Sequence, residues 1–103
     1  MLNSYRELIV WKKGIDLVLE IYQITYLFPK EELYGLISQI RREAVSIPSN
    51  IAEGYSRKHR QENLRFLRIS FGSGTELETQ LVIAKKLELA PSQAFKKSED
   101  LLV

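Results

Sequence analysis

Three short clusters of helix-breaking residues divide the chain into long segments. They are Phe28-Pro29-Lys30, Gly54-Tyr55-Ser56 and Ala90-Pro91-Ser92, and proline and glycine typically mark turns between regular elements. The segments between them lack the alternation of apolar and polar residues that is typical of a strand. The sequence therefore predicts four helices, near residues 6–28, 32–53, 57–89 and 92–103.

Short connections between these helices favour an antiparallel arrangement of neighbours. We therefore expect an all-α fold, an antiparallel up-down-up-down four-helix bundle with a short fourth helix. The 103 residues are enough for one domain, 1–103, and too few for two. The apolar share of 45% and charged share of 27% are those of a globular protein, without an uninterrupted membrane span or a signal peptide. We expect a cytoplasmic protein.

The first predicted helix has an unusually wide apolar face. On a helical projection its apolar residues between 15 and 28 spread over roughly 220°, whereas a surface helix of a monomeric bundle needs little more than about 100°. One core cannot cover that arc. Either another chain covers the surplus, which favours a homo-oligomer, or the helix is enclosed by its own chain.

The second predicted helix has a single apolar stripe of roughly 120°. Pro48 lies inside this helix, where it removes a backbone hydrogen bond, and we expect a kink near residues 44–48. Gly54 suits the left-handed position that ends a helix, and Ser56 is a plausible N-cap for the next one.

The third predicted helix carries a mixed pattern. Gly72 and Gly74 indicate either a close helix approach or a bend. Glu78 falls inside the apolar arc, where a lone carboxylate is costly, so we expect it to meet Arg41, Arg42 or a polar side chain of a neighbouring helix. The residues expected in the core are Leu64, Phe66, Leu67, Phe71, Leu77, Leu81 and Ala84. The fourth helix is so short that either the chain is truncated or another subunit covers what it leaves exposed.

No catalytic or metal-binding pattern is present in the sequence. The chain has no cysteine and one histidine, His59, which excludes thiolate sites and the paired Glu-x-x-His motifs of a di-iron bundle. We predict no catalytic residue, no metal and no cofactor, and interpret His59 as solvated. A polar row on the second helix that includes Asn50 and Glu53 is interpreted as inter-helix hydrogen bonding.

Basic residues are concentrated at the start of the third helix. Residues 55–70 contain five Lys or Arg against the single acid Glu62, a local net charge of +4, which exceeds the +2 of the whole chain. On the helical projection four of the five share a face roughly 100° wide, able to follow a phosphate backbone, and Tyr55 and His59 could stack on bases. The ordinary alternative is a face that is solvated or paired with acids of a neighbour.

Three segments closely resemble a known family. They are ELIVWKKGIDLVLEIYQIT (7–25), FPKEELYGLISQIRREAVSIPSNIAEGYSRK (28–58) and FLRISFGSGTELETQL (66–81), and SIPSNIAEG (46–54) is the most specific piece. They resemble the four-helix-bundle proteins encoded in intervening sequences of bacterial 23S ribosomal RNA genes. Those proteins are similar to accessory proteins of diversity-generating retroelements, which bind nucleic acid and a reverse transcriptase.

The resemblance implies a ring-like homopentamer with a central channel and a basic surface drawn from Arg41, Arg42, Arg57, Lys58, Arg65 and Arg68. Gly14 and Gly74 depart from the family, whose members tend to carry a helix former at these positions.

We predict a non-enzymatic, homo-oligomeric protein, a pentamer by resemblance, that binds RNA or DNA through a basic helix face. The alternative is an interaction scaffold that docks an acidic protein, and an enzyme with a subunit-interface site around Asn50, Glu53 or Glu78 is a more distant one. The candidate nucleic-acid-binding residues are Arg41, Arg42, Arg57, Lys58, Arg60, Arg65 and Arg68.

Overall fold

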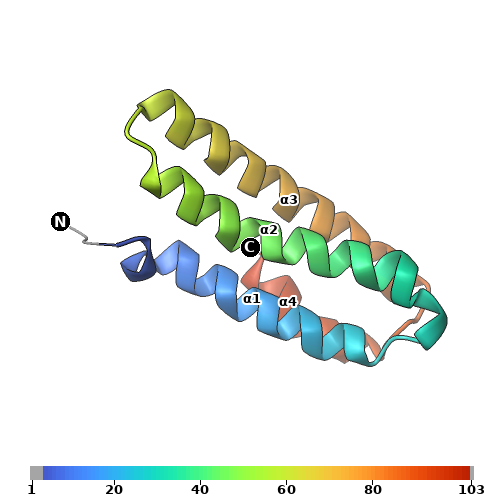
Figure 1. The fold of residues 1–103 in the computed structure, drawn as a ribbon. Coiled ribbons are helices and arrows are strands. Elements are labelled where there is room, and N and C mark those ends of the chain that lie inside the picture. The colour runs from blue at the N-terminus through green and yellow to red at the C-terminus, as the bar shows by residue number, and fades with distance from the viewer. Residues whose placement is uncertain (1–3, 103) are drawn as a thin grey trace.

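The structure, a computed structural model, describes residues 4–102 and contains four α-helices. They are α1 (Ile9–Tyr26), α2 (Ser38–Ser56), α3 (Arg60–Lys86) and α4 (Lys96–Leu101). The first three run antiparallel to their neighbours with α2 in the middle, and the short α4 packs behind α1 (Figure 1). The predicted all-α four-helix bundle with a short last helix is confirmed, and the bounds agree within three residues for α1 and α3, whereas α2 and α4 begin six and four residues later than predicted. None of the described helices is both long and apolar enough to cross a membrane.

Short 3₁₀ or π-helical turns precede α1, α2 and α4. A π-helical turn leads into α2, and inside it Gly35 leaves helical geometry with φ −111° and ψ −108°. The predicted second helix is therefore irregular in its first turns. The 3₁₀ segments are Tyr5–Glu7, Lys30–Glu32 and Ser92–Phe95, and the π turn spans Leu33–Ile37.

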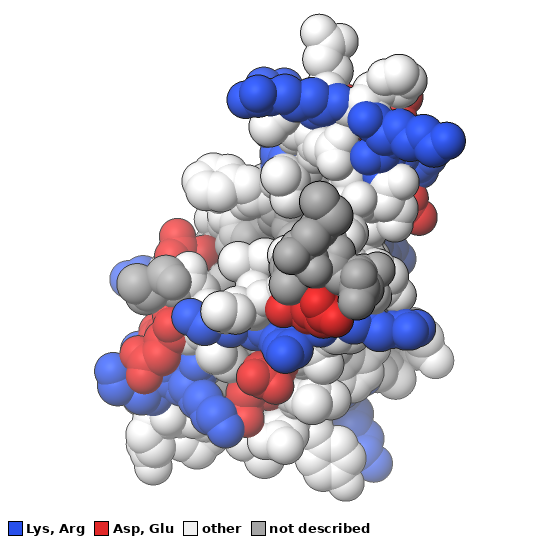
Figure 2. Space-filling model, turned by 90° about the vertical axis from the view of Figure 1, so that its left-hand side faces the viewer, with Lys and Arg blue, Asp and Glu red and all other residues white. Residues whose placement is uncertain are grey.

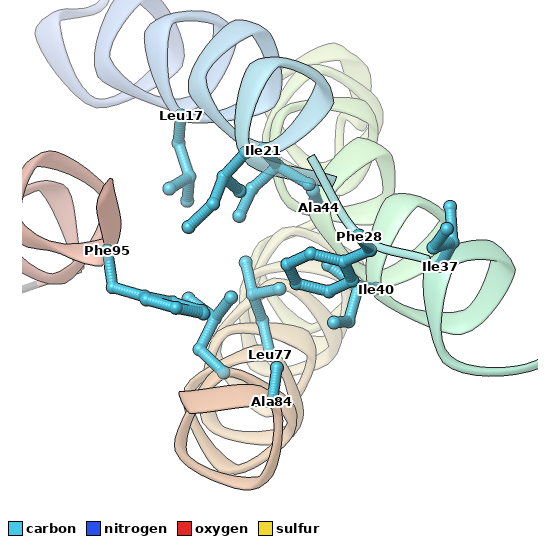
Figure 3. Close-up of a cluster of buried hydrophobic side chains, with 11 residues drawn as sticks. Leu17, Ile21, Phe28, Ile37, Ile40, Ala44, Leu77, Ala84 and Phe95 are labelled. Atoms are coloured by element: carbon cyan, nitrogen blue, oxygen red, sulfur yellow. The ribbon is translucent and has the colours of Figure 1, made fainter. Parts of the chain in front are cut away.

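The core lies where all four helices meet, in the half of the bundle that contains α4 (Figure 3). Phe95, at the entrance to α4, is fully buried, and its ring centroid lies 6.2 Å from that of Phe28. Salt bridges tie α4 to its neighbours, because Lys85 meets Glu99 at 3.0 Å. A second salt bridge, between Lys97 of α4 and Glu20 of α1 at 3.1 Å, joins α4 to α1. The buried core consists of Leu17, Ile21, Ile24, Phe28, Ile37, Ile40, Ala44, Leu77, Leu81, Ala84 and Phe95.

The second half of α2 differs from the sequence-based expectation. The helix is continuous through Pro48, whose ring is buried, and the non-helical backbone is at Gly35 instead. Gly54 is also helical and buried, and among the described residues no glycine has a positive φ. Ser56 does not cap α3, because it is the last residue of α2 and its hydroxyl donates to the Ala52 carbonyl at 2.9 Å. The predictions for Gly54 and Ser56 were wrong because packing against α3 keeps residues 54–56 helical.

The first half of α3 is less buried than predicted. Phe71 is 79% exposed, and Leu64 and Leu67 are also exposed, whereas Ser70 and Ser73 are buried. The reason is that α3 meets α2 here through small side chains, and no other helix among residues 4–102 covers its apolar flank. Glu78 is exposed as well and makes no ion pair with a described residue. The expected partner for Glu78 is therefore wrong.

The outer face of α1 is apolar and exposed, as its wide arc predicts. Leu17, Ile21 and Ile24 face the core, while Leu19 is 58% and Tyr26 84% exposed. Within the described chain nothing covers this outer face. The alternative that α1 is enclosed by its own chain is therefore wrong.

Candidate nucleic-acid interface

The connection between α2 and α3 carries the candidate basic residues that are close in sequence. Helical geometry ends at Arg57, whose φ of −80° and ψ of 143° are extended. His59 then precedes the first residue of α3, Arg60, without a capping bond from its side chain. Arg57 and Lys58 thus lie in the turn and not on α3. The face predicted from a single helical projection therefore does not exist as one helix face.

The fold nevertheless brings two of these residues, Arg57 and Arg65, to one aromatic ring. The guanidinium carbon of Arg57 lies 4.9 Å from the ring centroid of Phe66, and that of Arg65 lies 5.9 Å from it. A guanidinium is attracted to the face of an aromatic ring within about 6 Å. Phe66 therefore draws a residue of the turn and a residue of α3 to the same place. We call this group the basic turn, and it consists of Arg57, Lys58, Arg60, Arg65 and Arg68.

All five side chains of the basic turn are exposed. Arg57 forms a 2.7 Å ion pair with Glu53, one turn earlier in α2; the described residues form no other ion pair with the group. Figure 2 shows Lys and Arg side chains gathered at the top of the molecule, where α2 meets α3, while acids are more frequent lower down. Most of the positive charge of the basic turn is therefore not neutralised by ion pairs with residues 4–102.

Close packing fixes the position of the basic turn. The Asn63 amide donates to the Gly54 carbonyl at 2.7 Å. A Cβ at Gly54 would lie 3.1 Å from the Asn63 carbonyl oxygen and 3.1 Å from the Phe66 Cβ. Gly54 thus allows the end of α2 to approach α3 closely, which places Phe66 beside Arg57.

Arg41 and Arg42 lie near the start of α2, far from the basic turn at its end. They are about four turns, or roughly 24 Å, from Arg57 along α2 at 1.5 Å per residue. Arg41 is half-buried beside α1, where its Nε donates to Thr25 at 2.9 Å, and Arg42 is exposed. The candidate residues therefore form two separate sites at opposite ends of α2.

Residues 6–103 match the sequence profile of the 23S rRNA-intervening sequence proteins. The chain belongs to this family. The family resemblance of the sequence is thereby confirmed over nearly the whole chain. No curated protein matches the chain closely enough to serve as a relative.

In this 23S rRNA-intervening sequence protein, the inter-helix hydrogen bonding predicted for the polar row on α2 is confirmed for Ser46. The prediction is wrong for Asn50 and Glu53, whose described partners, Ser46 and Arg57, are local. The hydroxyls of Ser46 and Ser73 are 2.8 Å apart and link α2 to α3, and the Ser70 hydroxyl donates to the Ile47 carbonyl at 3.0 Å. Asn50 instead donates within α2, to the carbonyl and the hydroxyl of Ser46. The row is thus a structural seam between the two helices.

Two carboxylates meet at the edge of this seam. A hydrogen bond with the Glu76 side chain raises the pKa of Glu43 above its usual value, and partial burial and the charge of Glu76 act in the same direction. Ser73 and Arg42 oppose the shift. Sequence reasoning missed this pair because it depends on the register between α2 and α3. Across residues 4–102, no three His, Asp or Glu side chains come together as a metal site would require.

A groove of about 530 Å³ lies between α1 and α3, with α2 as its floor and the end of α4 at one side. Val10, Phe71 and Leu102 give it an apolar lining, and Lys13 and Glu78 are its charged members. This apolar lining suits packing of another apolar segment.

Proposed function

We propose that this 23S rRNA-intervening sequence protein is a non-enzymatic homo-oligomer that binds RNA or DNA through its basic turn. The observation that carries the proposal is that Arg57 and Arg65 both lie against the ring of Phe66, while the five residues of the basic turn form one ion pair with a described residue, Arg57 with Glu53. Exposed cations held at a fixed spacing displace the counterions of a nucleic acid, which is the main source of affinity for a phosphate backbone. The basic turn therefore supports binding that is independent of base sequence.

The proposal is tested by fluorescence anisotropy with a structured RNA hairpin and a DNA duplex over a range of salt concentrations. Binding is expected to weaken linearly in log–log form as salt rises. The double variant Arg65→Gln/Arg68→Gln removes two exposed cations from α3 and is expected to bind more weakly at low salt. Its salt slope should be smaller in magnitude by about 2, since each lost phosphate contact contributes about 0.9.

A matched control is Lys86→Gln/Lys96→Gln, which removes the same charge from exposed positions at the far end of α3 and the start of α4. This variant is expected to bind like the unchanged protein. If the control weakens binding as much as the α3 variant, net charge and not the basic turn determines affinity. If neither nucleic acid binds at low salt, the proposed function is wrong.

Self-assembly is supported by the apolar surface that the chain leaves uncovered. Leu19 and Tyr26 on α1 and Phe71 on α3 are more than half exposed. Contiguous exposed apolar surface is uncommon on monomeric proteins and is typical of interaction sites. In a ring, each subunit would present one basic turn, and several weak sites on one nucleic acid would bind together by avidity.

Light scattering on the purified protein tests the assembly. The expected mass is a whole multiple of the 12.0 kDa chain, and five chains if the subunit number implied by the family resemblance applies. Leu19→Glu places a charge on the outer face of α1 and is expected to lower the mass, because a buried unpaired charge opposes association. A single-chain mass at millimolar concentration contradicts the oligomer.

A further inference from the structure

The side chain of Arg41 is held from two sides before any ligand arrives. Its Nε donates to Thr25 Oγ1 at 2.9 Å, and its guanidinium carbon lies 4.5 Å from the ring centroid of Tyr22. Thr25 is buried, and its own hydroxyl donates to the Ile21 carbonyl at 2.6 Å. The Thr25 oxygen is therefore an acceptor for Arg41, and the two contacts fix the plane of the guanidinium against α1.

This arrangement leaves the outer edge of the guanidinium without a partner. An arginine has five N–H donors in a planar fork that matches a carboxylate or a phosphate. The Thr25 contact uses the single N–H of Nε. Among the ion pairs of residues 4–102, none includes Arg41. A half-buried cation with one neutral acceptor is thus prepared to bind an oxyanion.

Arg41 borders an open groove of about 530 Å³ at the junction of α1, the π turn and α2. Tyr22 and Tyr34 line it together with Arg41 and Arg42, and its described lining includes no Asp or Glu. Tyr34 is 94% exposed. The groove therefore combines two cations with an aromatic ring that is almost free of its own chain.

The position of Tyr34 follows from the irregular backbone before α2. Tyr34 lies in the π-helical turn, next to the non-helical Gly35. Such turns interrupt the regular order of side chains and are frequent at functional sites. Here the turn leaves the Tyr34 ring at the rim of the groove that contains Arg41.

We propose that this groove is a subsite for one unpaired nucleotide of a bound RNA or DNA strand. The fork of Arg41, with Arg42 beside it, binds the phosphate, and the base stacks on Tyr34. Single-stranded nucleic acids are commonly recognised by an aromatic ring for the base and a basic side chain for the backbone. An acidic peptide would use the two cations but gains little from the exposed ring. The inference rests on the proposed function and adds a preference for unpaired nucleotides.

The test compares a single-stranded oligoadenylate with a blunt-ended duplex, which has no unpaired nucleotide, by fluorescence anisotropy at low salt. Tyr34→Ala is expected to weaken binding of the single strand about tenfold, within the range observed for loss of a stacking ring. Tyr34→Phe keeps a stacking ring and is expected to bind like the unchanged protein. Both variants should fold normally, because Tyr34 is almost fully exposed.

Arg41→Lys keeps the charge but loses the planar fork and is expected to weaken single-strand binding by a similar factor. Duplex binding should change little in the Tyr34 and Arg41 variants, whereas Arg65→Gln/Arg68→Gln should weaken binding of both ligands. Circular dichroism and a melting curve show whether Arg41→Lys is folded. If it is not, Tyr34→Ala still tests the subsite independently, because Tyr34 is almost fully exposed.

Unchanged single-strand affinity in Tyr34→Ala overturns the subsite, and duplex binding in the same experiment shows that the proposed function still stands. Displacement of the strand by polyglutamate at equal charge concentration also overturns it, because the groove would then select acidic chains in general. Failure of every nucleic acid to bind removes the proposed function together with the subsite.

Discussion

Gly14 of α1 and Pro48 of α2 touch at the point where these two helices approach each other. A Cβ placed on Gly14 would lie 3.2 Å from the Pro48 Cβ and 3.4 Å from its Cδ. Both residues are buried. The proline that α2 tolerates in its interior thus packs its ring against the one position of α1 where a side chain is missing.

We predict that Gly14→Ala lowers the free energy of unfolding by about 1 kcal/mol, although alanine is the better helix former. The added methyl group meets a rigid buried ring, and overpacking costs about 1–3 kcal/mol, which exceeds the propensity gain of about 1 kcal/mol. Urea unfolding monitored by circular dichroism measures the change.

Gly72→Ala is the matched control. A Cβ at Gly72 has no neighbouring atom within 4 Å, so only the propensity gain applies and the variant should be more stable by up to about 1 kcal/mol. Equal stabilisation by both substitutions would show that α1 and α2 separate easily at Gly14.

Phe95 is the residue that makes the short α4 part of the core. It is fully buried although α4 itself has only six residues. Phe95→Ala should therefore lower the free energy of unfolding by about 3–5 kcal/mol, the usual cost of removing a buried aromatic ring. The measurement is the midpoint of urea denaturation, with the exposed Lys96→Ala as its neighbour control. A loss below 1 kcal/mol would mean that α4 is only loosely attached.

Truncation of Ser98 in α4 is expected to stabilise the protein, in contrast to truncation of Phe95. Its side chain is fully buried, and its Oγ has no hydrogen-bond partner among the described residues. A buried hydroxyl without a partner costs about 1–3 kcal/mol, so Ser98→Ala should stabilise the protein by about 1 kcal/mol. Differential scanning calorimetry checks this as a higher Tm. A lower Tm would show that the hydroxyl is satisfied.

The helices could be predicted from the sequence because each requires only local information. Apolar spacing and breakers located all four to within six residues. The cluster at Gly54 was misread, since a glycine before Tyr-Ser looks like a helix end, and only the approach of Phe66 explains why it stays helical. The exposure of Phe71 was missed for a related reason: a helical projection shows which face is apolar but not whether another helix reaches it.

The candidate site was predictable to a similar extent. Charge counting found the residues of the basic turn, because they are close in sequence. It could not show that Arg57 and Arg65 share the ring of Phe66 or that Arg41 stacks on Tyr22. These contacts depend on the register between helices, which no local pattern contains.

The side chains of Glu43 and Glu76 form a pair of carboxylates between α2 and α3. Because Glu76 raises the pKa of Glu43 in the folded chain, folded Glu43 retains a proton above pH 4.5, where the unfolded chain has lost it. The free energy of unfolding therefore falls as pH rises from 4.5 to the raised pKa, and the loss persists at neutral pH.

Glu76→Gln removes the repulsion and should raise the free energy of unfolding at pH 7 by about 0.5 kcal/mol, the scale of like-charge pairs on helix surfaces. Urea unfolding at pH 4 and pH 7 should show a smaller decrease with pH in this variant than in the unchanged protein. Asp16→Asn, which removes an exposed carboxylate on α1, is the control and should leave the difference between the two pH values unchanged. If Glu76→Gln instead destabilises the protein at pH 7, the hydrogen bond between the two side chains outweighs their repulsion.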